Sequence, residues 1–524
     1  MTASVAAGLS GDSGWILTAA TLVVAGLLLV PGWIVGRSAR LAALPSLAVA
    51  PALSSAIIAA AEILALTLAL PWLPWGWAVI AGLTAVVALM ARLLVGAPPE
   101  RARRAASQGR AEWVILAAGL TVAVAVPAGV ILTVLPGPGY PAQVFDATFH
   151  LNAVAAIREG GNASMLGGLS ALYSGRAVYY PTVWHGAVAL APGSPAPVST
   201  AGVLALTAVV WPLSLLGLLA RATGLDAARA SETDRARRRQ RACAVAAVLA
   251  LSAAVVGFPL LPMTALAVWP YALSVVGLPG VLVLYDLLRQ ETVSWRLRLV
   301  LVLLAMAAAG GVVAAHGTGL FNLAVLSQPF LVNLLVSRWR RSATRRGGRA
   351  LLVVGAVASV LVLAMGAWGM RASLASVLGY QRPAGGVGGI VATLGQALID
   401  LPMYGAVPGA SLPVGIVFGG LTLAAAWSAR AHRDQRPWLV MWLLSLLLVV
   451  LVGGPQWAGR QLGAPWYLQK ARILPLVILP ALVLMVQAGA GRPGRRLWGL
   501  LRRLASWVGG ARPQRAAVAM LAAL

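Results

Sequence analysis

Residues 437–454 form the run PWLVMWLLSLLLVVLVGG, which has no charged side chain and is preceded by Arg430, Arg433 and Arg436. An apolar run of roughly 20 residues is long enough to cross the hydrocarbon core of a bilayer as a helix. Similar runs recur along all 524 residues, of which 60% are hydrophobic and only 10% are charged. A soluble domain averages about 25% charged residues. The pattern therefore predicts an all-α polytopic membrane protein.

The basic residues lie mainly in short clusters between the apolar runs. The chain has 40 Lys and Arg against 13 Asp and Glu, which gives a net charge of +27. Most of the basic residues fall in alternate loops, and an excess of Lys and Arg is typical of cytoplasmic loops. The charge thus indicates a membrane topology, with the N-terminus outside and the C-terminus inside, and not a nucleic-acid partner. The 13 expected spans are 15–36, 41–70, 74–95, 113–135, 197–220, 242–261, 269–288, 298–315, 319–337, 350–370, 411–429, 437–454 and 472–490.

These spans predict a single transmembrane domain over residues 1–490. Its long loops, at about 136–196, 371–410 and 455–471, all fall on the outer side, so we expect a plasma-membrane protein with an extracytoplasmic working face. Residues 491–524 are expected to form a basic cytoplasmic tail, either an interfacial amphipathic helix or a disordered segment. No cleavable signal peptide is expected.

The first long loop carries the pair of residues best suited to chemistry. Asp146 and His150 lie in the sequence FDATFHLN at 145–152, and residues four apart share one face of a helix. A carboxylate beside an imidazole can take a proton from a hydroxyl group. We therefore identify Asp146 and His150 as catalytic candidates and Asn152 as a substrate-binding candidate. The alternatives are that Asp146 caps the helix and that His150 packs beneath the loop.

The same loop continues with YYPTVWHG at 179–186. The rings of Tyr180 and Trp184 suit the apolar faces of a sugar or a polyprenyl chain, and the alternative is an interfacial aromatic belt. A belt does not explain His185. His316, in a tight outer turn between two spans, can face the same cavity. All four residues are substrate-binding candidates.

Cations at the outer end of the last span depart from the positive-inside trend. Arg460, Lys470 and Arg472 lie there beside Trp466 and Tyr467. We expect the three cations to bind a phosphate, which Arg can do through two parallel hydrogen bonds. The two aromatic residues are substrate-binding candidates. The alternative is ordinary pairing of the cations with anionic lipid headgroups.

Three motifs carry a resemblance to a known superfamily. They are Asp-x-x-Phe-His-x-Asn from 146, Tyr-Pro-x-x-Trp-His from 180 and Trp-Tyr-x-x-x-x-Arg from 466. Together they resemble an actinobacterial multi-pass family of GT-C character, and GT-C glycosyltransferases use polyprenyl-phosphate sugars.

The resemblance implies that Asp146 is the catalytic acid or base, with His150 beside it, and that Arg472 contacts the phosphate. It also implies a polyprenyl-phosphate-linked sugar as donor and a cell-wall glycan or lipid-linked molecule as acceptor. A divalent metal is not expected, because Ala147 stands where a second acid would complete a metal-binding pair.

The sequence therefore predicts a membrane glycosyltransferase with Asp146 as general base. One alternative is a lipid or solute transporter. It would use Glu62, which lies inside the second span, as its coupling group, because an ionisable residue within a membrane is usually functional or paired. Another alternative is a non-catalytic membrane subunit of a cell-envelope assembly machine.

Overall fold

The structure is a computed structural model that describes residues 12–96, 109–140, 142–226, 232–290, 294–341, 350, 353, 357, 375, 379–401, 403 and 411–491. Within these residues the fold is all-helical, and an isolated antiparallel bridge joins Leu166 to Tyr179. The α-helices are α2 (Asp12–Ser38), α3 (Ala43–Thr67), α4 (Trp72–Val95), α5 (Arg110–Val134), α6 (Phe145–Gly160), α7 (Val183–Ala189), α8 (Pro195–Leu204), α9 (Trp211–Thr223), α10 (Glu232–Ala253), α11 (Leu261–Met263), α12 (Trp269–Leu288), α13 (Trp295–Ala315), α14 (Gly319–Arg341), α17 (Gly386–Leu398), α18 (Ser411–Ala429), α19 (Arg436–Gly453) and α20 (Lys470–Ala490). Shorter helical segments are η2 (Ser170–Tyr173), η3 (Ala205–Val210), η4 (Val256–Leu260) and η6 (Ala458–Trp466).

Ten of the described helices are long and apolar enough to cross a membrane, which confirms the prediction of an all-α multi-pass membrane protein. One of them is the continuous run of α8, η3 and α9 from Pro195 to Thr223. The expected span 319–337 lies within α14, which is not among these ten helices. The expected span 350–370 lies almost entirely outside the described residues, and the expected tail does so from residue 492 onward.

The expected span 242–261 is not one straight helix. It begins inside α10 and ends inside the segment Val256–Met263, and these two helical pieces are bent by 54° relative to each other. Phe258 has an extended backbone, and Pro259 has no N–H to donate. Freed backbone groups need other partners in an apolar layer. The Asp400 carboxylate supplies them by accepting hydrogen bonds from the N–H groups of Val256 (2.5 Å) and Gly257 (2.8 Å).

Helix α3 packs against α2, α4, α9, α12 and α13. Its sequence is rich in alanine and serine, and small residues let neighbouring helices approach closely. Glycines of the neighbours complete this packing. A Cβ added at Gly311 would lie 1.9 Å from the Ala52 carbonyl oxygen, and one at Gly217 would lie 2.3 Å from that of Leu44. The backbone of α3 is therefore in direct contact with its neighbours.

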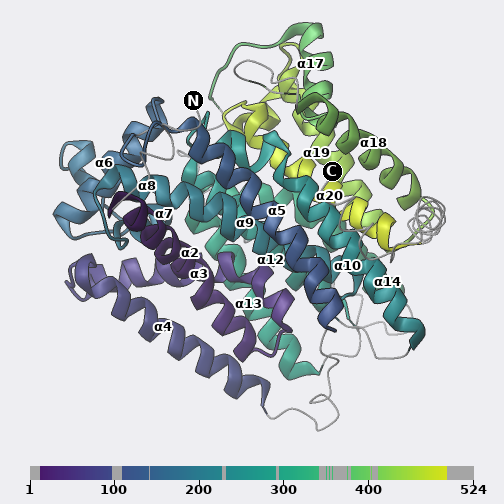
Figure 1. The fold of residues 1–524 in the computed structure, drawn as a ribbon, viewed down its shortest axis with the longest axis horizontal. Helices are drawn as coiled ribbons and strands as arrows, with labels where there is room; N and C mark the ends of the chain where they lie inside the picture. The colour runs from purple at the N-terminus through teal and green to yellow at the C-terminus, as the bar shows by residue number, and fades with distance from the viewer. Residues whose placement is uncertain are drawn as a thin grey trace.

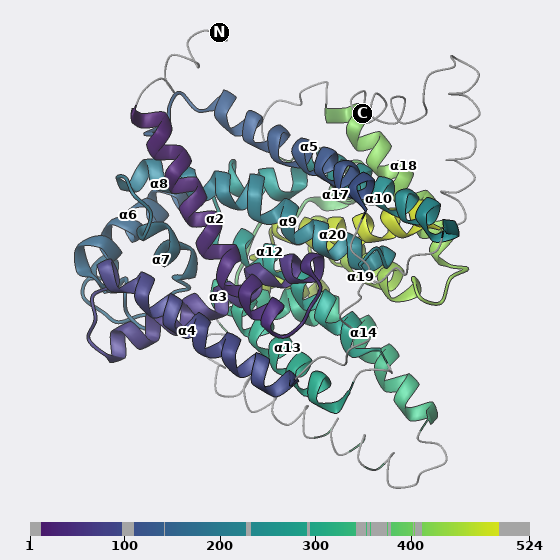
Figure 2. The same cartoon turned by 60° about the horizontal axis from the view of Figure 1, so that its bottom comes forward.

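The two ends of the bundle differ in character. Figures 1 and 2 show α6, α7 and α8 together at one end, which we call the site end. The first turn of α2 lies there too, because a Cβ added at Gly193 would be 3.2 Å from Ile16. At the opposite end of α12, Arg221 pairs with Asp286 (2.7 Å) and Asp226 (3.2 Å). The ion pairs of Arg221 are thus at the opposite end of α12 from the site end.

Candidate functional site

Helix α6 holds Asp146 in its first turn. The helix follows Val144, whose backbone is extended and which occupies the N-cap position, so Asp146 does not cap the helix. An acidic side chain in the first turn is stabilised by the positive end of the helix dipole. The helix ends before Gly161, which adopts the left-handed conformation (φ 65°) that favours glycine. Asp146 is half-buried, and the structure shows no hydrogen bond or ion pair from its carboxylate to a described residue.

His150 and His185 form a buried pair that joins α6 to α7. The His150 Nδ1 and His185 Nε2 atoms are 2.9 Å apart. The rings of Trp184 and Trp269 lie 6.0 Å and 5.2 Å from the His150 ring, and 4.8 Å from each other. Burial lowers the pKa of His185 to about 3, and the carbonyls of Pro181 and Thr182 offset only part of this effect.

Burial also lowers the pKa of His150 well below its usual value, and the proximity of His185, His316 and Arg472 lowers it further. Both imidazoles of the pair are therefore neutral at neutral pH. Because its Nδ1 is engaged by His185, His150 fixes the position of α6 against α7 beside Asp146. This is a positioning role.

Arg472 enters the site from the first turn of α20. Its guanidinium lies over the Tyr467 ring, 4.7 Å from the centroid, and 5.5 Å from the Tyr271 ring. Its Nε donates a hydrogen bond to Gln469 Oε1 (2.7 Å), and the Tyr271 hydroxyl donates to its backbone carbonyl. The structure shows no partner among the described residues for the two terminal nitrogens. Arg472 therefore presents the geometry that binds an oxyanion through two parallel hydrogen bonds.

Aromatic side chains cluster near Asp146 and Arg472. The Phe149 ring lies 4.9 Å from Tyr180 and 6.4 Å from Tyr173. Burial raises the pKa of Tyr180, and the charges of Tyr173 and Asp146 raise it further while Arg472 lowers it. Tyr180 is therefore near enough to the acid and the cation for their charges to act on its hydroxyl group.

His316 closes the site from the α13–α14 turn. Its ring lies 5.5 Å from that of Tyr271, and its Nδ1 accepts a hydrogen bond from the Thr318 N–H (3.2 Å). Burial, and secondly the charge of Arg472, lowers its pKa to about 3. The structure thus places His316 beside Tyr271 and within reach of the Arg472 charge, and the expectation that it faces the same cavity as Asp146 stays a prediction.

The electrostatics of the site centre on Asp146 and Arg472. Burial raises the pKa of Asp146, and the charge of Arg472 opposes that shift. The two groups are close enough to interact, yet no ion pair joins them. A reacting group can therefore lie between them. A carboxylate with a raised pKa is a stronger base than an ordinary aspartate.

Four predicted residues do not join this cluster. Asn152 is exposed on another face of α6. Trp466 is buried behind the site, where its Nε1 donates to Asn322 Oδ1 (2.7 Å). Lys470 Nζ donates to Gln396 Oε1 on α17 (2.8 Å).

Arg460 is the fourth of these residues. Its Nε donates to the Val452 carbonyl (3.0 Å), and its terminal nitrogens donate to the carbonyls of Arg382 (2.6 Å) and Pro383 (2.8 Å). Every nitrogen of this guanidinium is engaged by backbone, so Arg460 fixes the loop before α17. The three expected phosphate-binding cations do not form one group, and only Arg472 faces Asp146.

Three contributors to the site were missed by sequence reasoning. Tyr271 supports Arg472, Trp269 packs on His150, and Gln469 orients the Arg472 guanidinium. Trp269 and Tyr271 stand at the start of a predicted span, where aromatic residues are common at the interface. Their position at the start of a span was the signal from which the sequence could have identified Trp269 and Tyr271. Nothing in the sequence marks Gln469.

Glu62 lies at the site end of α3, where its carboxyl group is buried. Its Oε2 accepts a hydrogen bond from the Thr182 hydroxyl (2.9 Å). A Cβ added at Gly186 would lie 2.1 Å from Glu62 Oε1, and the Gly186 carbonyl accepts from Trp72 Nε1 (2.9 Å). Thr182 and Gly186 of the 179–186 motif therefore allow α7 to pack directly against the Glu62 carboxyl group. Glu62 packs the site, a placement that gives no support to a coupling role in transport.

Among the described residues, no group of three or more His, Cys, Asp and Glu side chains is arranged as a metal-binding set. We therefore derive no step through a metal.

The helices and the site define a polytopic membrane protein whose polar site lies at one end of the bundle. A family model matches residues 25–524, so the chain belongs to DUF6541, a family of unknown function. Neither the curated proteins nor the solved structures gave a match to the chain.

Proposed function

We propose that this protein is a membrane glycosyltransferase. It moves a sugar from a polyprenyl-phosphate donor to the hydroxyl group of a cell-envelope acceptor. The proposal is supported chiefly by one observation: a half-buried Asp146 and a buried Arg472, from segments far apart in the sequence, interact electrostatically among aromatic side chains without forming an ion pair.

In the proposed reaction, Asp146 removes the proton of the acceptor hydroxyl as its oxygen forms a bond to the anomeric carbon of the sugar. The bond between that carbon and the phosphate oxygen breaks, and the lipid phosphate leaves with the electron pair. Arg472 stabilises the negative charge that develops on this phosphate. The raised pKa of Asp146 suits it to the role of base.

The rings around the site serve the sugar and the lipid. Phe149, Tyr180 and Tyr467 offer flat apolar faces to a sugar ring, and the Tyr180 hydroxyl faces the reacting groups. The His150–His185 pair keeps Asp146 in place. We assign the site end to the extracytoplasmic side of the plasma membrane, with 13 spans and the N-terminus outside, because the sequence places its arginine-rich clusters in alternate loops and the Arg221 ion pairs lie at the other end of α12.

The test is turnover of radiolabelled polyprenyl-phosphate sugars by the purified protein in nanodiscs, with envelope glycans as acceptors. Asp146→Asn should abolish transfer while leaving expression and thermal unfolding unchanged. Glu159→Gln is the matched control, because Glu159 is exposed at the far end of the same helix. If Asp146→Asn transfers the sugar at the wild-type rate, the assignment of Asp146 as the general base is wrong. Transfer of no sugar from any donor in the panel by the wild type would count against the proposed activity.

A further inference from the structure

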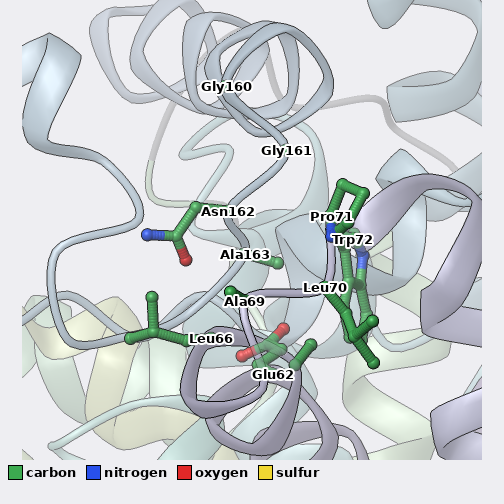
Figure 3. Close-up of a pocket in the computed structure, with 11 residues that line it drawn as sticks. Glu62, Leu66, Ala69, Leu70, Pro71, Trp72, Gly160, Gly161, Asn162 and Ala163 are labelled. Atoms are coloured by element: carbon green, nitrogen blue, oxygen red, sulfur yellow. The ribbon is translucent and has the colours of Figure 1, made fainter.

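A cavity of about 270 Å³ lies at the other end of α6 from Asp146. Its lining comes from the end of α3, the α3–α4 turn and the segment after α6, as Figure 3 shows. Fourteen residues of α6 separate Asp146 from Gly160, which is about 21 Å at 1.5 Å per residue. The cavity is therefore separate from the proposed reaction centre.

The polar lining of this cavity consists mainly of hydrogen-bond acceptors. Glu62 is 1% exposed, and its Oε1 has no hydrogen-bond partner among the residues that the structure describes. Figure 3 shows its carboxyl group extending from α3 below Asn162 and Ala163. Asn162 Oδ1 is a second acceptor, although it already receives the Ser164 N–H (2.9 Å).

Two helix C-termini converge on the cavity. Ala65 and Leu66 belong to the last turn of α3, and Gly160 is the last residue of α6. Each C-terminus carries a partial negative charge. The positive end of α4 adds little, because Leu73 is non-helical and the Trp72 N–H already donates to the Gly161 carbonyl (2.6 Å).

The carboxyl group has no basic counterpart here, since Glu62 forms no ion pair with a described residue. A buried, ionised carboxylate without a counter-charge is costly. A group that brings three donors and a positive charge would supply the counter-charge that the Glu62 carboxyl group lacks and would complement the two helix ends. We propose that this cavity binds a primary ammonium group, with Glu62 as its counter-ion.

The size of the cavity favours an organic ammonium over a bare metal ion. A water molecule has a share of only about 30 Å³ in the liquid, so the 270 Å³ cavity has room for several heavy atoms beside the charged group. Leu66, Leu70 and Trp72 provide an apolar wall for such a body. Trp75 and Trp77, exposed on the adjoining first turn of α4, place the cavity at headgroup depth. The ammonium can therefore come from an aminophospholipid or from a free amine.

The test uses purified protein in detergent and two kinds of probe. n-Butylammonium should raise the unfolding temperature of the wild type, and n-butanol at the same concentration should not. Glu62→Gln should weaken butylammonium binding about tenfold or more, because a hydrogen bond to a charged group is lost. Glu159→Gln should behave as the wild type, since Glu159 is exposed and does not line the cavity.

Leu66→Trp provides a second variant if Glu62→Gln does not fold. It fills the cavity while keeping the carboxyl group, so butylammonium should have no effect on it. Native mass spectra then separate the two sources. If the wild type retains phosphatidylethanolamine in preference to phosphatidylglycerol and Leu66→Trp does not, the ammonium group comes from a lipid headgroup. If the wild type responds to butylammonium alone, the ammonium group comes from a free amine. Equal responses of the wild type and Glu62→Gln, or of the wild type to the amine and the alcohol, would overturn the proposal. So would failure of the wild type to bind either the amine or phosphatidylethanolamine.

Discussion

Replacing Arg472 by glutamine should weaken the binding of polyprenyl phosphate strongly. The terminal nitrogens of Arg472 have no partner among the described residues, while Tyr467, Tyr271 and Gln469 hold the guanidinium in place. A hydrogen bond to a charged group contributes about 1.5–3 kcal/mol. Glutamine can replace at most one of the two bonds, and without charge. We therefore expect a loss of about 3 kcal/mol, which is roughly a 150-fold weaker Kd.

Binding can be measured by titrating a short-chain polyprenyl phosphate into the protein in nanodiscs. The matched control is Arg176→Gln, because Arg176 is exposed in the loop between α6 and α7 and should not contribute. The backbone carbonyl of Arg472 still accepts from Tyr271, so Arg472→Gln should unfold close to the wild-type temperature. If the two variants bind the lipid with equal affinity, the assignment of Arg472 as the phosphate contact is wrong.

Three further predictions follow from particular contacts. Asp146→Asn should lower transfer by about 10²–10⁴-fold. The wild-type rate should also fall as the pH drops through the pKa of Asp146, which burial raises above its usual value. A wild-type rate that does not change between pH 4 and 8 would contradict the role of Asp146 as base. Burial raises the pKa of Asp400 to about 7, so the free energy of unfolding should fall by up to about 4 kcal/mol as the pH rises from about 4 to 7. Asp400→Asn should remove that dependence in denaturant titrations at several pH values, and an unchanged slope would refute the linkage. Gly311→Val should lower the unfolding temperature, because the Cβ of the new valine would lie 1.9 Å from a carbonyl oxygen of α3. The control Gly310→Val should leave the unfolding temperature unchanged, because a Cβ at Gly310 meets open space. Equal effects of the two substitutions would contradict the close packing of α3.

The sequence predicted the fold class because the apolar runs and the charge clusters are long-range averages that single contacts do not disturb. It did not predict the bend after α10. That bend depends on Phe258 and Pro259 and on Asp400, which is distant in sequence and binds the freed N–H groups. A tertiary hydrogen bond of this kind leaves no periodic pattern.

The candidate site was predicted only in part, because the sequence shows local patterns but not the tertiary contacts of each side chain. Asp146 and His150 were found because helical spacing is a local property, and Arg472 because it is an exception to the charge rule. The sequence grouped Arg460 with Arg472 because both are outer cations. It could not show that backbone carbonyls engage the whole Arg460 guanidinium. The partner of a charged side chain is decided by the packing of distant segments.

The same limit applies to Glu62. An ionisable residue in a span is recognisable from sequence, and its partners are not. The Thr182 hydroxyl and the close approach of Gly186 come from a loop more than a hundred residues away. These contacts place Glu62 between α7 and a cavity, which leads to the proposed ammonium site.

The central claim is that Asp146 and Arg472 flank the reacting bond of a lipid-phosphate sugar. The most direct measurement is a cryo-EM map of the protein in nanodiscs with a polyprenyl-phosphate sugar and inactive Asp146→Asn. The account predicts the phosphate on the terminal nitrogens of Arg472, with the sugar between that residue and position 146 and against Tyr180. A lipid phosphate bound elsewhere on the site end, or a space between Asp146 and Arg472 filled by protein, would contradict the account.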